Sequence, residues 1–150
     1  MLSLFLSSAA TASKPGIRDT CPYGLVRSVN PFHLQVFIGT CFYFVVNERL
    51  EYKEAKLKCS TFGGLSALPK TETLNNYLTN QSQHYYGVGD ELWIGLHDEK
   101  DKRTFIWEDK EELTWENFAG DNGPDNNWFI ELFEDCVALN PMDGFWYEFW

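Results

Sequence analysis

A long stretch without helical or strand periodicity, residues 114–134, restricts the fold of this chain more than any other feature. The stretch is polar and rich in Asn, Gly and Asp, yet it contains four aromatic residues: Trp115, Phe118, Trp128 and Phe129. A connection of this length without secondary structure is usually either functional or disordered. Because aromatic side chains supply large apolar surfaces, we expect an ordered loop rather than a disordered one.

Two helices are predicted before this loop. In residues 48–60, Tyr52, Ala55 and Cys59 recur at helical spacing, with Glu and Lys between them. Gly63 follows, and glycine accepts the left-handed conformation that ends many helices. A second, shorter helix is expected to open at residues 69–71, with Leu74, Tyr77 and Leu78 on one face, and a polar loop is expected at residues 81–90.

Short apolar runs predict strands at residues 42–46, 92–96, 104–107 and 136–139, with a turn at residues 141–144 and a last segment at residues 145–150. The run at residues 92–96 is apolar throughout, which indicates a fully buried strand. Its Gly95 indicates a close approach of another segment to the backbone. Helices early and short strands late predict an α+β domain.

The charge is negative and unevenly distributed. The chain has 12 basic and 22 acidic residues, a net charge of −10, and its length of 150 residues suits one domain. From residue 90 onward there are 17 acidic and 4 basic residues, which argues against a nucleic-acid surface. The acidic part is either a solubilising surface or a site for a divalent cation, since hard cations need several carboxylate oxygens.

Several features favour an extracellular protein. Residues 1–12 are similar to a clipped secretory signal with cleavage after Ala12, so residues 1–20 are interpreted as a signal or leader and residues 21–150 as the domain. Asn80 opens an N-glycosylation triplet. The uncharged stretch at residues 28–47 is not a membrane span, because its Asn, Pro, His and Gln are costly in lipid; residues 36–46 are instead interpreted as a buried strand.

The four cysteines are Cys21, Cys41, Cys59 and Cys136. They form no Cys-x-x-Cys pair and the three histidines are scattered, so disulfides are favoured over a zinc site. An enzyme is also disfavoured. The adjacent carboxylates Glu111-Glu112 and Glu134-Asp135 point to opposite faces if they lie on strands, and no nucleophile triad or phosphate-binding loop is present.

Four motifs together resemble a C-type lectin-like domain. They are the Glu-Ala-x-x-x-Cys pattern of residues 54–59, Gly-Gly-Leu-Ser-Ala-Leu at residues 63–68, Trp-Ile-Gly-Leu at residues 93–96 and Glu-Asp-Cys-Val at residues 134–137. Their order and spacing agree with the family over roughly residues 21–150. The resemblance implies two helices, small antiparallel sheets and a long irregular loop.

The resemblance also implies the roles of the cysteines. Cys21 and Cys41 match the pair that closes the N-terminal hairpin of the long-form domains. Cys59 and Cys136 match cysteines whose partners lie near the end of the family's domain, beyond Trp150, which indicates a C-terminally truncated chain. The alternative is a family variant in which both of these cysteines stay reduced.

Sugar-binding members of this family hold a calcium ion, and the resemblance assigns its ligands here. The matching carboxylates are Asp125, Glu134 and Glu148, whereas Gly123 and Tyr147 stand where the family has oxygen ligands. If the alignment slips, Asp121, Asn122, Asn126 and Asn127 are substitutes. A second calcium site would use Asp98 and Asp135, with Asn126 and the unfavourable Lys102 at its other two positions.

These observations lead to two functional expectations. The first is a secreted or extracellular lectin module that binds carbohydrate through calcium, with Trp128 either stacking on the sugar or packing the loop on the core. The second is a calcium-independent module that recognises a protein or another non-sugar ligand. Neither expectation includes nucleic acid or a membrane span as a partner.

Overall fold

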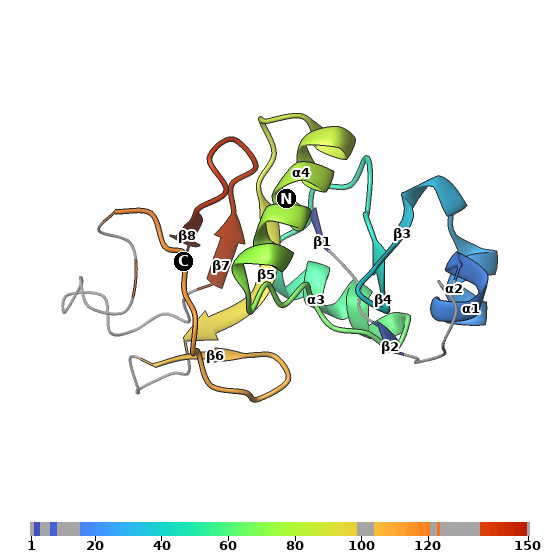
Figure 1. Cartoon of the computed structure of the whole chain (residues 1–150), viewed down its shortest axis with the longest axis horizontal. Coiled ribbons are helices and arrows are strands. Elements are labelled where there is room, and N and C mark those ends of the chain that lie inside the picture. The colour runs from blue at the N-terminus through green and yellow to red at the C-terminus, as the bar shows by residue number, and fades with distance from the viewer. Residues whose placement is uncertain are drawn as a thin grey trace. The chain divides into compact units, whose positions relative to one another are not determined.

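The computed structural model describes residues 2–3, 7–8, 16–98, 104–120, 123 and 136–149 (Figure 1). The chain divides into two compact units, residues 1–67 and residues 68–150, and each is described by itself. Among the described residues, no helix combines the length and the hydropathy that crossing a membrane requires.

The first unit begins with short elements. They are β1 (Leu2–Ser3), β2 (Ser7–Ser8), α1 (Ile17–Thr20), α2 (Tyr23–Ser28) and the 3₁₀ helix η1 (Pro31–His33). Asn30 caps η1, because its side-chain oxygen accepts a hydrogen bond from the Phe32 amide. The region interpreted as a leader from the sequence therefore contains β1, β2 and α1.

An antiparallel hairpin follows, formed by β3 (Leu34–Phe37) and β4 (Thr40–Tyr43), and β2 pairs with the other edge of β4. The single strand predicted for residues 36–46 was wrong, because the chain reverses at Ile38 and Gly39. Both residues have positive φ, 47° and 71°, as the two central residues of a tight hairpin turn require. Isoleucine rarely adopts such a φ, so Ile38 does not indicate a turn.

The helix α3 (Tyr52–Thr61) confirms the first predicted helix, although it starts four residues later. Glu54 accepts a hydrogen bond from the Glu51 amide at this N-terminus. Tyr52, Ala55 and Cys59 are buried, as their spacing predicts. At the C-terminal end Gly63 has a φ of 80°, the left-handed conformation expected there.

The second unit opens with α4 (Glu72–Tyr86), which Thr71 caps through a hydrogen bond from the Leu74 amide. The prediction of a short helix followed by a polar loop at residues 81–90 was wrong, since α4 continues to residue 86. Its buried face consists of Asn75, Leu78 and Ser82. Many residues of α4 are polar and have only modest helix propensity. Burial of this face stabilises the helical conformation of the whole segment.

The sheet of the second unit contains β5 (Leu92–Asp98), β6 (Phe105–Trp107), β7 (Cys136–Leu139) and β8 (Trp146–Phe149). β6 and β7 pair with opposite edges of β5, β8 pairs with β7, and all three pairings are antiparallel. Residues 92–96 are buried, as predicted, and His97 is buried as well. A Cβ atom on Gly95 would lie 2.5 Å from Leu68 Cδ2, which confirms the predicted close approach.

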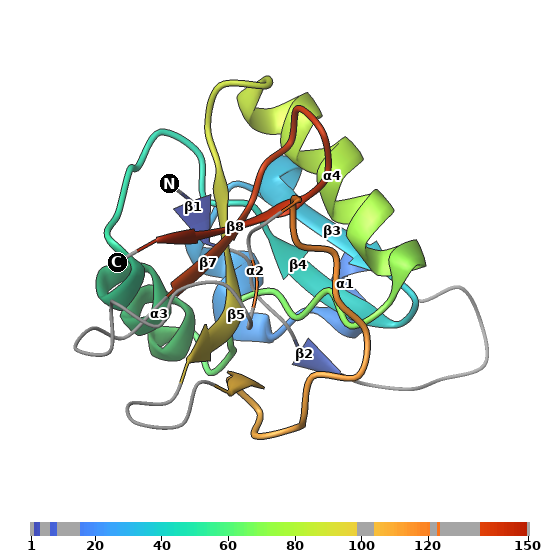
Figure 2. The ribbon, with the colours of Figure 1, turned by 90° about the vertical axis from the view of Figure 1, so that its left-hand side faces the viewer.

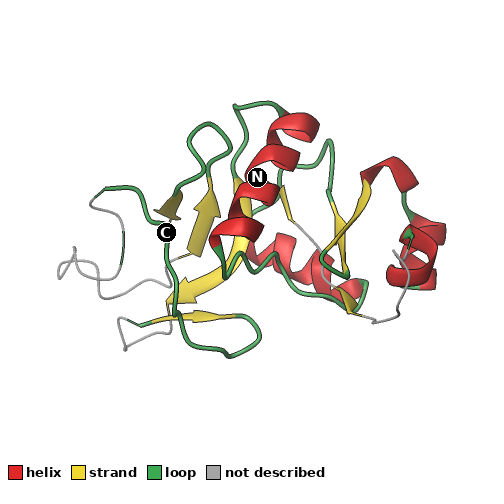
Figure 3. Cartoon of the chain, viewed as in Figure 1, coloured by secondary structure: helices red, strands yellow, loops and turns green. Residues whose placement is uncertain are grey.

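The architecture is therefore the predicted α+β class, with helices and small antiparallel sheets (Figure 3). Within residues 104–120, the chain beyond β6 runs as loop (Figure 3). This loop segment and β8 carry the candidate site.

Candidate functional site

The first part of the long loop is hydrogen-bonded to β8. The Trp146 amide donates to the Asn117 carbonyl at 2.9 Å, and the Ala119 amide donates to the Trp146 carbonyl at 3.0 Å. Phe118 and Trp146 thereby form a parallel bridge. Figure 2 shows β7 and β8 side by side. Residues 117–119, which we call the loop base, are thus fixed to the strand that carries Tyr147 and Glu148.

An aromatic cluster supports the loop base from inside. The Trp146 ring is fully buried and meets Trp107, Trp115 and Phe118 edge-on at centroid distances of 5.7, 5.3 and 5.5 Å. Phe118 also contacts Phe105 at 5.2 Å. Such edge-on pairs are favourable beyond the area that they bury. At least two aromatics of the long loop, Trp115 and Phe118, therefore pack on the core.

A polar network holds the other side of Trp146. The Trp146 indole Nε1–H donates to Asn75 Oδ1 at 2.7 Å, and Asn75 Nδ2 donates to the Gly144 carbonyl at 2.9 Å. Asn117 Nδ2 donates to the same carbonyl at 2.8 Å. The network joins α4, the β7–β8 turn and the loop base. The helical spacing did not predict this network, because it grouped the apolar residues Leu74, Tyr77 and Leu78 on one face.

Of the predicted ligand residues, Glu148 lies on β8 opposite Val137 and is half-buried, with its Oε1 shielded from solvent. Tyr147 donates its phenol hydrogen to Asp143 Oδ2 at 2.7 Å. This hydrogen bond, together with a small effect of burial and the nearby negative charge, raises the pKa of Tyr147. The Tyr147 hydroxyl thus already binds a carboxylate of its own chain.

The resemblance assigns Gly123 to the position of a ligand-bearing Glu or Gln. Its φ is 132°, a conformation that L side chains rarely adopt, and an added Cβ would lie 3.3 Å from the Phe118 ring. A longer side chain at this position would therefore meet both backbone strain and the Phe118 ring.

Of the other predicted ligand residues, the structure describes Asp98 alone. Asp125, Trp128, Glu134 and Asp135 lie outside the described residues. Asp98 ends β5, where its Oδ1 accepts a hydrogen bond from the Thr104 amide at 2.9 Å. Within the described ranges, no group of three or more His, Cys, Asp or Glu residues could hold a metal ion.

The described residues do not fit the calcium shell that the resemblance implies. Calcium takes six to eight oxygen ligands, several of them carboxylates. Of the three described residues that the resemblance assigns to ligand positions, Glu148 provides a carboxylate, Gly123 provides no side chain, and the Tyr147 phenol is bound to Asp143. A phenol and a glycine cannot replace the two missing oxygen ligands.

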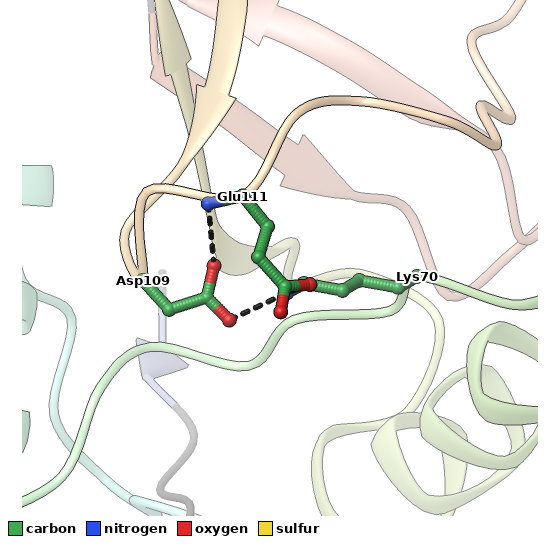
Figure 4. A network of polar contacts seen from close by, with 3 residues as sticks. All are labelled: Lys70, Asp109 and Glu111. Carbon is green, nitrogen blue, oxygen red and sulfur yellow. Dashed lines mark hydrogen bonds and ion pairs between the residues drawn. The ribbon is translucent and has the colours of Figure 1, made fainter.

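An ion network on Lys70 joins two further segments of this unit (Figure 4). Lys70 Nζ lies 2.5 Å from both Asp109 Oδ2 and Glu111 Oε2, and Asp109 Oδ1 accepts a hydrogen bond from the Glu111 amide. Burial lowers the pKa of Lys70, but the hydrogen bonds to Asp109 and Glu111 outweigh it, so the net pKa is raised. The network ties the segment before α4 to the turn after β6.

Glu91 is expected to destabilise the fold at neutral pH. Burial raises the pKa of this half-buried carboxyl group, and the negative charge of Asp143 raises it further. When the folded state raises the pKa of a carboxyl group, the group favours folding at pH values below the pKa that it has in the unfolded chain. This stabilisation is lost as the pH rises through the higher pKa of the folded state. We therefore expect Glu91→Gln to raise the free energy of unfolding at pH 7 by about 0.5 kcal/mol or less.

The measurement is urea unfolding of the wild type and Glu91→Gln at pH 7 and again at about pH 3.5, below the ordinary glutamate pKa. The gain should vanish at the lower pH. Glu116→Gln removes an exposed carboxylate of the same unit and is the matched control. A gain of equal size at both pH values would contradict this explanation.

The structure confirms the predicted Cys21–Cys41 disulfide. Cys59 is buried and Cys136 is half-buried. Their pairing with cysteines beyond residue 150 stays a prediction. Asn80 is exposed on α4, whereas Ser82 of the same glycosylation triplet is fully buried in the helix. Glycosylation of Asn80 also stays a prediction.

Comparison with known proteins identifies the family. The family model described as Lectin C-type domain matches residues 48–148. C-type mannose receptor 2 of Rattus norvegicus is 32% identical over 117 residues, which are 75% of this chain and 7% of the receptor. The alpha-N-acetylgalactosamine-specific lectin of Patiria pectinifera is 32% identical over 113 residues, 71% of this chain and 63% of that lectin. The chain thus spans a small part of the receptor and less than two thirds of the lectin.

Solved structures agree with this family. The carbohydrate-recognition domain of the human scavenger receptor C-type lectin superposes with a TM-score of 0.65 at 25% identity, over 81% of this chain and 89% of that one. Human lithostathine superposes with a TM-score of 0.61 at 19% identity, over 95% of this chain and 96% of that one, which supports the fold alone. The chain belongs to the C-type lectin domain family.

Proposed function

We propose that this chain is an extracellular carbohydrate-binding domain whose ligand face consists of β8, the β7–β8 turn and the long loop. The observation that carries the proposal is the attachment of the loop base to Trp146, which fixes residues 117–119 to the first residue of β8. Two matched proteins are named for sugar binding, namely the lectin of Patiria pectinifera and the human carbohydrate-recognition domain.

The chemistry of this face suits a sugar. Sugar hydroxyls donate hydrogen bonds to carboxylates, and their apolar C–H faces lie against aromatic rings. Glu148 on β8 and Asp143 in the β7–β8 turn are the described carboxylates of these elements, and the Phe145 amide donates a hydrogen bond to Asp143 Oδ1, with 42% of the Phe145 surface exposed. Asp125, Glu134 and Trp128 are proposed to complete it from the long loop. The role is binding, without catalysis.

An extracellular location follows from the same proposal. The Cys21–Cys41 disulfide supports it, since disulfides persist in oxidising compartments. The similarity of residues 1–12 to a clipped secretory signal supports it as well.

We expect sugar binding to persist when calcium is removed. Gly123 and Tyr147 supply no calcium ligand where the family has two, and the Tyr147 phenol is held by Asp143. The same observation favours a second candidate function, calcium-independent recognition of a protein, in which the long loop is the contact surface.

The experiment is a glycan-array screen of the whole chain, with calcium and with EDTA. We expect specific glycan binding in both conditions, and a roughly tenfold or greater loss of affinity in Glu148→Gln and in Asp125→Ala, the usual cost of a hydrogen bond to a charged group. Glu72→Gln, an exposed change on α4, is the control.

The other outcomes are distinct. Binding in calcium that EDTA abolishes would contradict calcium independence and show that Asp125, Glu134 and Glu148 complete an ion site. Absence of glycan binding in both conditions would contradict the carbohydrate proposal and favour protein recognition.

A further inference from the structure

Asn75 is a buried polar residue on a helix that carries none of the predicted ligands. Asn75 is 1% exposed and lies on the buried face of α4 with Leu78 and Ser82. Burial of an amide costs free energy unless its hydrogen-bonding groups are satisfied. Both ends of the Asn75 amide have partners: Oδ1 accepts from the Trp146 indole, and Nδ2 donates to the Gly144 carbonyl.

These two partners lie at either end of one short segment. Gly144 closes the β7–β8 turn and Trp146 begins β8, so a single side chain fixes the turn and the strand to α4. The fit is close, because a Cβ on Gly144 would lie 3.3 Å from Thr79 Oγ1, one helical turn along α4 from Asn75. The Thr79 hydroxyl in turn donates to the Asn75 carbonyl at 2.9 Å.

The orientation of the indole determines where the loop base lies. The Trp146 ring meets Trp115 and Phe118 of the loop segment edge-on, and the Trp146 backbone bonds Asn117 and Ala119. Phe118 then lies against Gly123, farther along the loop. A rotated indole would displace Phe118, and with it the start of the long loop.

We propose that Asn75 is a positioning residue for the ligand face: by fixing the Trp146 indole and the Gly144 carbonyl, it sets the position of β8 and of the loop base. The effect on ligand binding rests on the proposed function, whereas the effect on the loop base does not. Asn75 contacts no ligand and acts through Trp146.

The test compares Asn75→Ala, which removes both hydrogen bonds, with Leu78→Ala, which removes a fully buried apolar side chain from the same helix face. Leu78→Ala destabilises the unit by loss of packing and leaves the polar network intact. Both variants are studied at a temperature at which circular dichroism shows them folded. Asn75→Asp, which retains an acceptor for the indole, is the conservative variant.

The first readout is hydrogen exchange by ¹⁵N NMR. Asn75→Ala should shift the Trp146 indole resonance and accelerate exchange of that proton and of the Ala119 amide by about tenfold or more. Leu78→Ala should change the two protons only in proportion to its loss of global stability, and Asn75→Asp should leave the indole proton protected. Equal acceleration in Asn75→Ala and Leu78→Ala, once global stability is matched, would overturn the proposal.

The second readout is affinity for albumin conjugates of mannose and of N-acetylgalactosamine. Asn75→Ala should bind about tenfold more weakly than Leu78→Ala, whose affinity should equal that of the wild type within about twofold. If the wild type binds neither conjugate nor any arrayed glycan, the proposed function fails, and hydrogen exchange alone decides the role of Asn75. Unchanged affinity in Asn75→Ala with a binding wild type would overturn the proposal.

Discussion

Replacement of Trp146 by alanine is expected to lower the free energy of unfolding by about 3–5 kcal/mol, the usual cost of removing a fully buried large aromatic side chain. The Trp146 ring has no exposed surface and contacts Trp107, Trp115 and Phe118. Its removal would leave a cavity at the centre of this cluster. It would also leave Asn75 Oδ1 without its indole donor inside the core.

Urea unfolding followed by far-ultraviolet circular dichroism measures this loss without depending on tryptophan fluorescence. Trp115→Ala is the matched control, because Trp115 contacts the same ring but is only half-buried. We expect its cost to be clearly smaller than that of Trp146→Ala. A Trp146→Ala cost below about 1 kcal/mol, the level of many surface changes, would show that the cluster does not stabilise the loop base.

Local sequence patterns predicted those elements whose burial follows a simple period. Tyr52, Ala55 and Cys59 recur at helical spacing, and the structure buries all three on α3. The apolar run at residues 92–96 became the buried strand β5. In both cases each residue has the polarity that its place in the fold requires, so local pattern and tertiary structure agree.

The errors came from residues whose polarity contradicts their place in the fold. Ser82 is a polar residue in a buried position of α4, so the last turns of that helix resembled a loop. Ile38 is an apolar, β-branched residue at positive φ with 76% of its surface exposed, so the hairpin turn resembled the middle of a strand. Tertiary packing overrides local propensity at both places.

The residues of the candidate site stay a prediction, and their geometry had no signal in the sequence. The resemblance assigns Gly123, Tyr147 and Glu148 to ligand positions, two of them without a suitable ligand. It did not show that the Tyr147 phenol binds Asp143, nor that Lys70 binds Asp109 and Glu111, which lie 39 and 41 residues away. Pairings between distant side chains depend on the fold and have no local signature.

Removal of the Cys21–Cys41 disulfide, by the double change Cys21→Ser and Cys41→Ser, is expected to destabilise the first unit by about 3 kcal/mol. The two cysteines are 20 residues apart in sequence, and both are buried, one after α1 and one on β4. The bridge stabilises mainly by restricting the unfolded chain between them. The elements that it encloses are short, so they have little regular structure of their own with which to compensate.

Thermal unfolding with and without a thiol reductant tests this expectation. The reductant should lower the unfolding temperature of the wild type towards that of the double serine variant and should leave the variant unchanged. The variant retains Cys59 and Cys136 and is therefore the control for any effect of the reductant on these two cysteines. If reductant lowers the unfolding temperature of the variant as much as that of the wild type, a bridge other than Cys21–Cys41 carries the stabilisation. If neither is affected, the enclosed hairpin is held by its buried side chains, such as Leu34 and Phe42, rather than by the bridge.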